Sequence, residues 1–208
     1  LNPQVLDLLQ ELPSHYDAPG LLPCVSTVAP RRAQKFFDRL ISIKNQYYSH
    51  GQFQLQFSIH STNLNQRKQL MSSAIWDFQT IADYGKKWYH PGDRKITLNF
   101  AVAEDSIIDP GVISEHFSPE LFFIKMTPIN PTNQALQHKM WTPITQENYH
   151  NFTLAQEFES LGYDTLVSYG EWEENQIGSN CGQFATEYKN GKVKLKDNYT
   201  CEQYNLLD

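Results

Sequence analysis

Short apolar runs alternate with amphipathic segments along most of the chain. Runs rich in β-branched, aromatic and aliphatic residues predict buried strands at 21–28, 53–57, 95–103, 121–126 and 165–169. Apolar residues at helical spacing predict helices before and between them, at 5–12, 30–41, 63–71, 73–88, 107–117 and 145–161. Strand followed by helix, repeated with short polar connections, predicts a parallel sheet.

Residues that begin and end helices support this division. Pro13 is expected to end the first helix, and Pro30 is expected to open the second. Ser61, Thr62 or Asn63 is placed to cap the helix that follows the central strand. Right-handed crossovers would curl such units into part of a barrel. The predicted fold class is therefore α/β, a partial (β/α) barrel of parallel strands whose N-terminal units are expected upstream of Leu1.

The length suits one domain. We expect residues 1–186 to form the C-terminal part of the barrel with a cysteine-containing loop, and residues 187–208 to form a solvated tail. No apolar run is long enough to span a membrane and the start has no signal-peptide pattern, so the sequence predicts a cytoplasmic protein with no membrane partner. The oligomeric state stays open.

Charge and cysteine content narrow the candidate chemistry. The net charge of −6 argues against a general nucleic-acid surface, although it leaves a local basic path open. Cys24, Cys181 and Cys201 are too scattered for a disulfide framework or a metal site. Free thiols are expected, with Cys24 as buried filler in a strand, and no metal ligand is assigned.

Polar residues follow the ends of several predicted strands. Ser26, Ser58 to His60 and Asn130 occupy such positions, and the final loop is expected to bring Cys181 to the same end of the sheet. In α/β barrels and open parallel sheets the carboxyl ends of the strands hold the ligand, so these residues are expected on one functional face. The alternative is that Ser58 and His60 only complete loop and cap hydrogen bonds.

Five blocks, in order, resemble one enzyme family. They are STVAP at 26–30, FSIHSTNLNQRKQLM at 57–71, KITLNFAV at 95–102, MTPINPTN at 126–133 and SNCGQF at 179–184. Together they resemble the radical S-adenosylmethionine (radical SAM) enzymes that methylate adenine C2 or C8 in 23S ribosomal RNA. The resemblance extends from Leu1 to about Phe184. It implies a partial β/α barrel, S-adenosylmethionine and a [4Fe–4S] cluster as cofactors, and RNA as the substrate.

The resemblance also implies roles for particular residues. Ser26 matches a serine that contacts S-adenosylmethionine, and Ser58, Ile59 and His60 match a segment that lines the same cofactor. Asn130 matches another cofactor contact. Cys181 matches the family's catalytic cysteine, which is methylated by one cofactor molecule before a 5′-deoxyadenosyl radical from a second abstracts hydrogen from the S-methyl group.

Several positions depart from the family pattern. The three cysteines do not have the C-x3-C-x2-C spacing that holds the family's cluster, so those ligands are expected upstream of Leu1. Ala29 stands in place of a glycine, and Asn99 in place of an acidic residue. Glu171 to Glu174 are acidic where the family is more basic, which disfavours contact with RNA phosphates.

Two functions therefore remain open. The chain is part of a radical SAM methyltransferase with a methyl-carrying Cys181, and is inactive alone, or it is a non-catalytic adaptor or binding module that keeps the barrel but lacks the cluster. An unrelated α/β-barrel enzyme is a weaker alternative, because it does not explain five ordered blocks. The methyl acceptor and the role of Glu171 to Glu174 stay open.

Overall fold

Five strands pair in the order in which they occur along the chain. The computed structural model describes residues 2–18, 20–71, 74–129 and 140–169. All neighbouring strands are parallel, in the order β1 (Cys24–Thr27), β2 (Gln54–Ser58), β3 (Ile96–Val102), β4 (Phe122–Pro128) and β5 (Thr165–Val167). The prediction of an α/β fold with a parallel sheet is confirmed.

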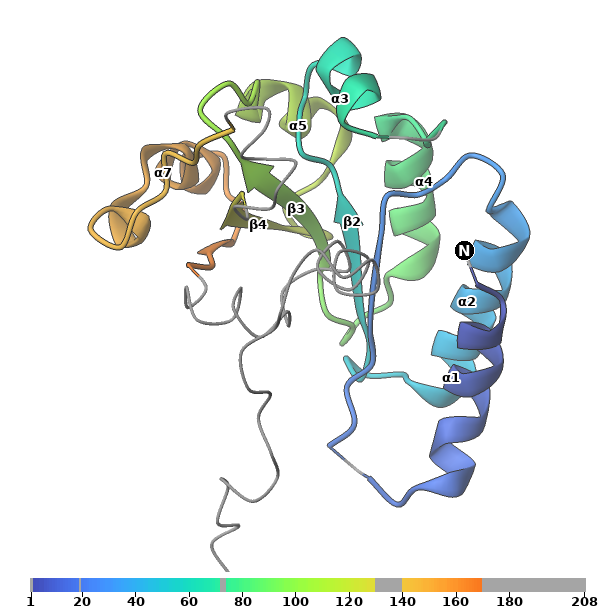
Figure 1. Cartoon of the computed structure of the whole chain (residues 1–208). Helices are drawn as coiled ribbons and strands as arrows, with labels where there is room; N and C mark the ends of the chain where they lie inside the picture. Colours follow the sequence, from blue (N-terminus) through green and yellow to red (C-terminus); the bar gives the residue numbers. More distant parts are fainter. Residues whose placement is uncertain (1, 19, 72–73, 130–139, 170–208) are drawn as a thin grey trace, which may run out of the picture.

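Helices connect the strands. They are α1 (Gln4–His15), α2 (Gln34–Tyr47), α3 (Leu64–Leu70), α4 (Phe78–Trp88), α5 (Pro110–His116), the 3-10 helix η1 (Tyr149–Asn151) and α7 (Thr153–Ser160). Figure 1 shows α1, α2 and α4 along one side of the sheet. No helix within the described part of the chain is both long and apolar enough to cross a membrane.

Alternate strand residues form the core. The buried strand positions include Leu55, Phe57, Ile96, Leu98, Phe100, Phe122, Ile124 and Met126. Aromatic rings from the helices pack with them: the Phe37 ring of α2 lies 6.1 Å from that of Phe57 and 4.3 Å from that of Trp76. The core thus lies between the sheet and its helices, because apolar residues at every second strand position share one face.

The first helix does not end at Pro13, as the sequence predicted, but continues to His15. Proline has no N–H, so the carbonyl of Leu9 loses its normal helical donor. The hydroxyl of Tyr48 donates to that carbonyl instead, at 2.6 Å. A buried tyrosine at the C-cap of α2 therefore compensates for the missing helical bond.

Helix α4 begins at Phe78, five residues later than predicted. The carboxylate of Asp77 accepts the N–H of Thr80 at 2.8 Å and caps the helix there. The preceding segment is extended: Arg31 N–H donates to the Ala74 carbonyl, and Trp76 N–H donates to the Ala29 carbonyl, both at 2.8 Å. These bonds to the connection after β1 hold residues 74–76 outside the helix.

Three other helices also begin later than predicted. Helix α2 starts at Gln34 instead of Pro30, α5 starts at Pro110 instead of residue 107, and α7 starts at Thr153 instead of residue 145. Before α7, Asn148 accepts the N–H of Thr145 at 2.8 Å through its side-chain oxygen and donates to the Pro143 carbonyl at 2.9 Å. Such side-chain bonds favour a turn over a helix.

A buried ion pair ties α2 to the connection between α4 and β3. The Lys44 ammonium lies 2.5 Å from the Asp93 carboxylate and 2.8 Å from the Trp88 carbonyl. Burial raises the pKa of Asp93, but hydrogen bonds from Lys44 and from the His90 N–H outweigh it, so the pKa is lowered. The charge of the buried Lys44 is thereby paired, as a buried charge requires.

Gly85 allows α4 to approach the sheet closely. A Cβ at this position would lie 2.3 Å from Cζ of Phe122, which is itself 1% exposed. We expect Gly85→Ala to lower the free energy of unfolding by about 1 kcal/mol, because overpacking costs about 1–3 kcal/mol and alanine regains about 1 kcal/mol of helix propensity. Urea denaturation followed by circular dichroism measures the change.

The matched control is Gly20→Ala, since no atom lies within 4 Å of a Cβ built there. We expect this variant to unfold within about 0.5 kcal/mol of the wild type. A Gly85→Ala protein as stable as Gly20→Ala would contradict the close contact between α4 and β4.

Candidate functional site

The strand face opposite the core is polar. In β2, Gln54, Gln56 and Ser58 alternate with the buried Leu55 and Phe57. Parallel pairing aligns polar residues from neighbouring strands into rows, with strands about 4.8 Å apart. One row joins Ser26, Gln56 and Thr97, and the next joins Ser58, Asn99 and Lys125. With Gln54 and Thr127, these residues form what we call the polar sheet face.

Side-chain amides link the first rows of this face. The Gln56 amide donates to the Ser26 hydroxyl at 2.9 Å, and the Gln54 amide donates to the Thr97 hydroxyl at 3.1 Å. The Ser58 hydroxyl makes no hydrogen bond to a described residue. The face therefore presents an ordered array of neutral donors and acceptors, with Ser58 free of bonds within that part of the chain.

Asn99 is the buried polar residue at the centre of the face. Its side chain is 8% exposed, and the oxygen Oδ1 has no hydrogen-bond partner among the described residues. The Asn99 carbonyl accepts the backbone N–H groups of Ile59 at 2.8 Å and His60 at 3.4 Å. An unsatisfied buried acceptor costs about 1–3 kcal/mol, so Oδ1 is a natural partner for a ligand donor.

His60 lies just after β2 with its ring in a defined protonation state. The residue has a left-handed backbone, with φ of 62°, and its Nδ1 accepts the Ala101 N–H at 3.0 Å. Burial, helped by the positive charge of Arg67, lowers the pKa of His60 to about 4. The ring is therefore neutral at pH 7, and its proton resides on Nε2, which is left as a hydrogen-bond donor.

These groups are suited to binding rather than to acid–base chemistry. The face offers amides, hydroxyls and a neutral imidazole, with Lys125 as its cation. In the described ranges no three His, Cys, Asp or Glu side chains group closely enough to hold a metal ion. A neutral ligand with several ring nitrogens and hydroxyls, such as a nucleoside, matches this set of donors and acceptors.

The structure brings several of the predicted site residues together. Ser26 and Ser58 lie on the polar sheet face, and His60 lies at its edge. Ile59 has a fully buried side chain, and its N–H and carbonyl are bonded to Asn99 and Ser61, so it supports the site from the core side. Asn130, Cys181 and the tail at 187–208 lie outside the described residues.

Sequence reasoning missed part of this face. Asn99 was noted only as a departure from a family pattern, and Gln56 and Lys125 were not singled out. The signal was the alternation of polar and apolar residues within the strands, which places every second residue opposite the core. Cys24 is a correction: it was expected as buried filler, but β1 leaves it exposed, because it alternates with the half-buried Val25.

The lowered pKa of His60 predicts a pH dependence of stability. The unfolded imidazole takes up a proton near pH 6.5, whereas the folded one resists protonation until about pH 4. The contribution of His60 to the free energy of unfolding is therefore fully present above pH 6.5. It is lost as the pH drops toward 4, and it amounts to about 3 kcal/mol. We expect His60→Asn, which tolerates the left-handed backbone, to lose this component in urea denaturation at pH 7, 6, 5 and 4.

His50→Asn is the matched control, because His50 is also left-handed, with φ of 58°, and is exposed. This variant should retain the full pH dependence of the wild type. The same pH dependence in wild type and His60→Asn would show that His60 is not buried in its neutral form.

No protein-family model, curated protein or solved structure matches the chain. The polar sheet face and the sequence resemblance are therefore the two indications of a function.

Proposed function

We propose that the polar sheet face binds S-adenosylmethionine through its adenosyl group, and that the chain is part of a radical SAM enzyme resembling the 23S rRNA adenine methyltransferases. The observation that carries the proposal is the unsatisfied Oδ1 of Asn99 on the polar row that leads from Ser58 to Lys125. An exocyclic amino group such as that of adenine supplies the donor that this oxygen lacks.

Other groups near Asn99 complement the rest of the cofactor. The Nε2–H of His60 suits an acceptor nitrogen of the adenine ring, and the Ser58 hydroxyl suits a ribose hydroxyl. Lys125 supplies a positive charge for the carboxylate of the methionyl part. The chain's own residues would therefore bind and orient the nucleoside, in agreement with the matches of Ser26, Ser58 and His60 to cofactor-lining positions.

The order of the strands supports the assignment of the sheet to a partial β/α barrel. Parallel strands in sequential order, with crossovers of one hand, place the connecting helices on one side of the sheet. A sheet of this kind curls toward a barrel as units are added. We infer a partial β/α barrel, with the polar sheet face lining its inside.

The cluster does not fit the cysteines of this chain. A [4Fe–4S] cluster requires several thiolates that converge on it, and Cys24, Cys181 and Cys201 lack the spacing of such a set. Cys181 remains the proposed methyl carrier: its thiolate would attack the sulfonium methyl carbon, forming a sulfur–carbon bond while S-adenosylhomocysteine leaves with the bonding pair. RNA remains the proposed methyl acceptor.

Binding of S-adenosylmethionine to this chain should be weak. The adenosyl contacts are a few hydrogen bonds worth about 1 kcal/mol each, so we expect a Kd on the order of millimolar. Amide chemical shifts in a two-dimensional NMR titration should change at residues 58–60 and 99–101. Asn99→Leu should weaken binding about fivefold, because the acceptor for the adenine amino group is lost.

The matched control is Asn45→Leu, at an exposed position of α2. It should bind S-adenosylmethionine as the wild type does. Shift changes confined to other parts of the chain, or equal affinities of Asn99→Leu and wild type, would contradict the proposed site.

The alternative is a non-catalytic adaptor or binding module that keeps the same face but lacks the cluster. The coding sequence upstream of Leu1 distinguishes the two functions. Three cysteines spaced C-x3-C-x2-C in the same reading frame would support the enzyme. A start codon with no such cysteines would support the adaptor, while weak binding of S-adenosylmethionine would be compatible with both.

A further inference from the structure

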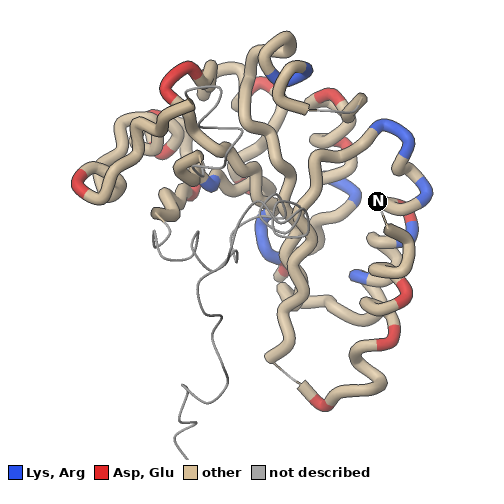
Figure 2. The backbone as a smooth tube through the Cα atoms, viewed as in Figure 1, with Lys and Arg blue, Asp and Glu red and all other residues tan. Residues whose placement is uncertain are grey.

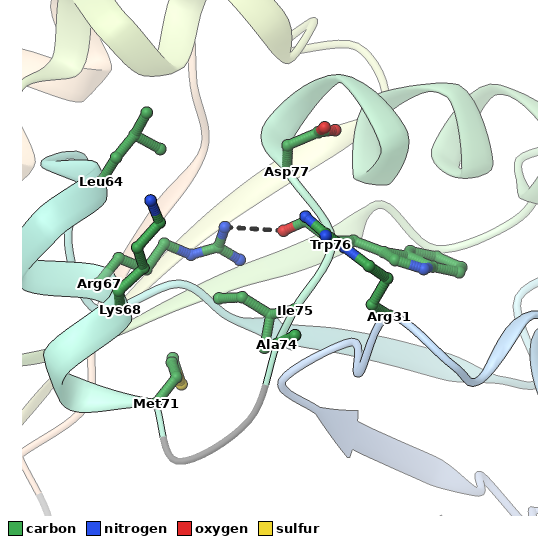
Figure 3. A pocket seen from close by; sticks show the side chains of 9 residues that line it. All are labelled: Arg31, Leu64, Arg67, Lys68, Met71, Ala74, Ile75, Trp76 and Asp77. Atoms are coloured by element: carbon green, nitrogen blue, oxygen red, sulfur yellow. Dashed lines mark hydrogen bonds between the residues drawn. The ribbon is translucent and has the colours of Figure 1, made fainter.

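A second candidate site lies beside α3, on the connection between α3 and α4. The pocket has a volume of about 530 Å³, within the range of small-molecule sites. Its charged lining residues are Arg31, Arg67, Lys68 and Asp77, and Met71 and Ile75 are among its apolar ones. Figure 3 shows Arg31 and Arg67 extending toward the middle of the pocket from opposite walls.

Arg67 is the unusual member of this group. It is 3% exposed and donates through one terminal nitrogen to the Trp76 carbonyl at 2.9 Å. Its Nε and its other terminal nitrogen have no hydrogen-bond partner among the described residues. The guanidinium also lies 4.9 Å from the centre of the Phe78 ring, which offsets part of its charge. A buried guanidinium with unused donors is costly unless an anion compensates it.

The carboxylate of Asp77 supplies only part of that compensation, through its charge and without an ion pair to Arg67. Asp77 caps α4, and hydrogen bonds from Thr80 are the main cause of its lowered pKa, with smaller contributions from the charges of Arg31 and Arg67. No ion pair joins Asp77 to a cation in the described part of the chain. The pocket therefore holds three cations and one carboxylate, and that carboxylate already accepts the N–H of Thr80 at the start of α4.

The pocket is thus a local cationic site on a chain of net charge −6. Figure 2 shows Lys and Arg on α3 and on the connection after β1, and Arg31, Arg67 and Lys68 from these two segments line the pocket. Arg31 and Lys68 are exposed at its rim, while Arg67 contributes a fixed charge below them. Such a combination concentrates anions, since the low-dielectric wall strengthens the field of a buried charge.

We propose that this pocket binds a phosphomonoester, with Arg31 and Lys68 contacting the phosphate and the organic part against Met71 and Ile75. Three cations and one carboxylate leave a net charge of +2, which matches the charge of about −1.5 to −2 on a phosphomonoester at pH 7. A carboxylate or a phosphodiester carries one negative charge and would leave the pocket positive. The proposal does not depend on the S-adenosylmethionine site.

Calorimetry on the 208-residue chain tests the pocket with four probes: phenyl phosphate, inorganic phosphate, dimethyl phosphate and a single-stranded RNA decamer. We expect phenyl phosphate to bind most tightly, because it carries both the dianion and an apolar ring. The double variant Arg31→Gln/Lys68→Gln should bind it at least about tenfold more weakly, since two charge-assisted hydrogen bonds are lost. Both positions are exposed, so the fold should be retained, as circular dichroism can verify.

Arg32→Gln is the matched control, because Arg32 is an exposed neighbour of Arg31 that does not line the pocket. The affinity of this variant for phenyl phosphate should change by less than about twofold. The Arg32 charge is exposed and does not line the pocket, so salt screens its effect on a bound phosphate. Three results would overturn the proposal: an equal loss of affinity in Arg32→Gln, dimethyl phosphate binding as tightly as phenyl phosphate, or measurable binding of the RNA decamer alone. The last would assign the cations to a nucleic-acid backbone.

Discussion

Parallel pairing of β2, β3 and β4 is the constraint on which the rest of the structure depends. The register of Ser58 with Asn99 and of Asn99 with Lys125 puts one set of alternate residues under the helices and the other on the opposite face. A shift of one residue in any strand would exchange the two sets. The same pairing therefore builds both the core and the polar sheet face. It also aligns the side chains of that face that are proposed to contact a ligand.

The chain leaves β1 and β2 through left-handed residues that are held by tertiary bonds. Ala29 has φ of 54° and His60 has φ of 62°, a conformation that costs a non-glycine residue about 1–2 kcal/mol. Trp76 N–H bonds to the Ala29 carbonyl, and Ala101 N–H bonds to the His60 ring. The glycine that the family resemblance expects at position 29 would suit this backbone. Strain at the carboxyl ends of strands is typical of positions that hold ligands.

The two candidate sites differ in chemistry. The polar sheet face carries amides, hydroxyls and one cation, Lys125, with the neutral imidazole of His60 at its edge, whereas the pocket beside α3 is dominated by guanidinium and ammonium groups. Arg67 lies between the two, because its charge contributes to the low pKa of His60 while its side chain lines the pocket. An anion bound near Arg67 would therefore also act on His60, which gives a physical route for coupling between the sites.

The sequence by itself determined the parallel α/β fold and the capped start of α3, where Asn63 accepts the N–H groups of two following residues. Apolar period and capping are local properties, so they can be predicted from a short stretch of chain. Only the tertiary structure decided that α1 continues through Pro13, that Asn99 is a buried acceptor, and that Arg67 is buried. These outcomes depend on partners distant in the sequence, as the bond from the Tyr48 hydroxyl to the Leu9 carbonyl illustrates. No local pattern specifies such partners, because they meet only when the sheet and its helices pack together.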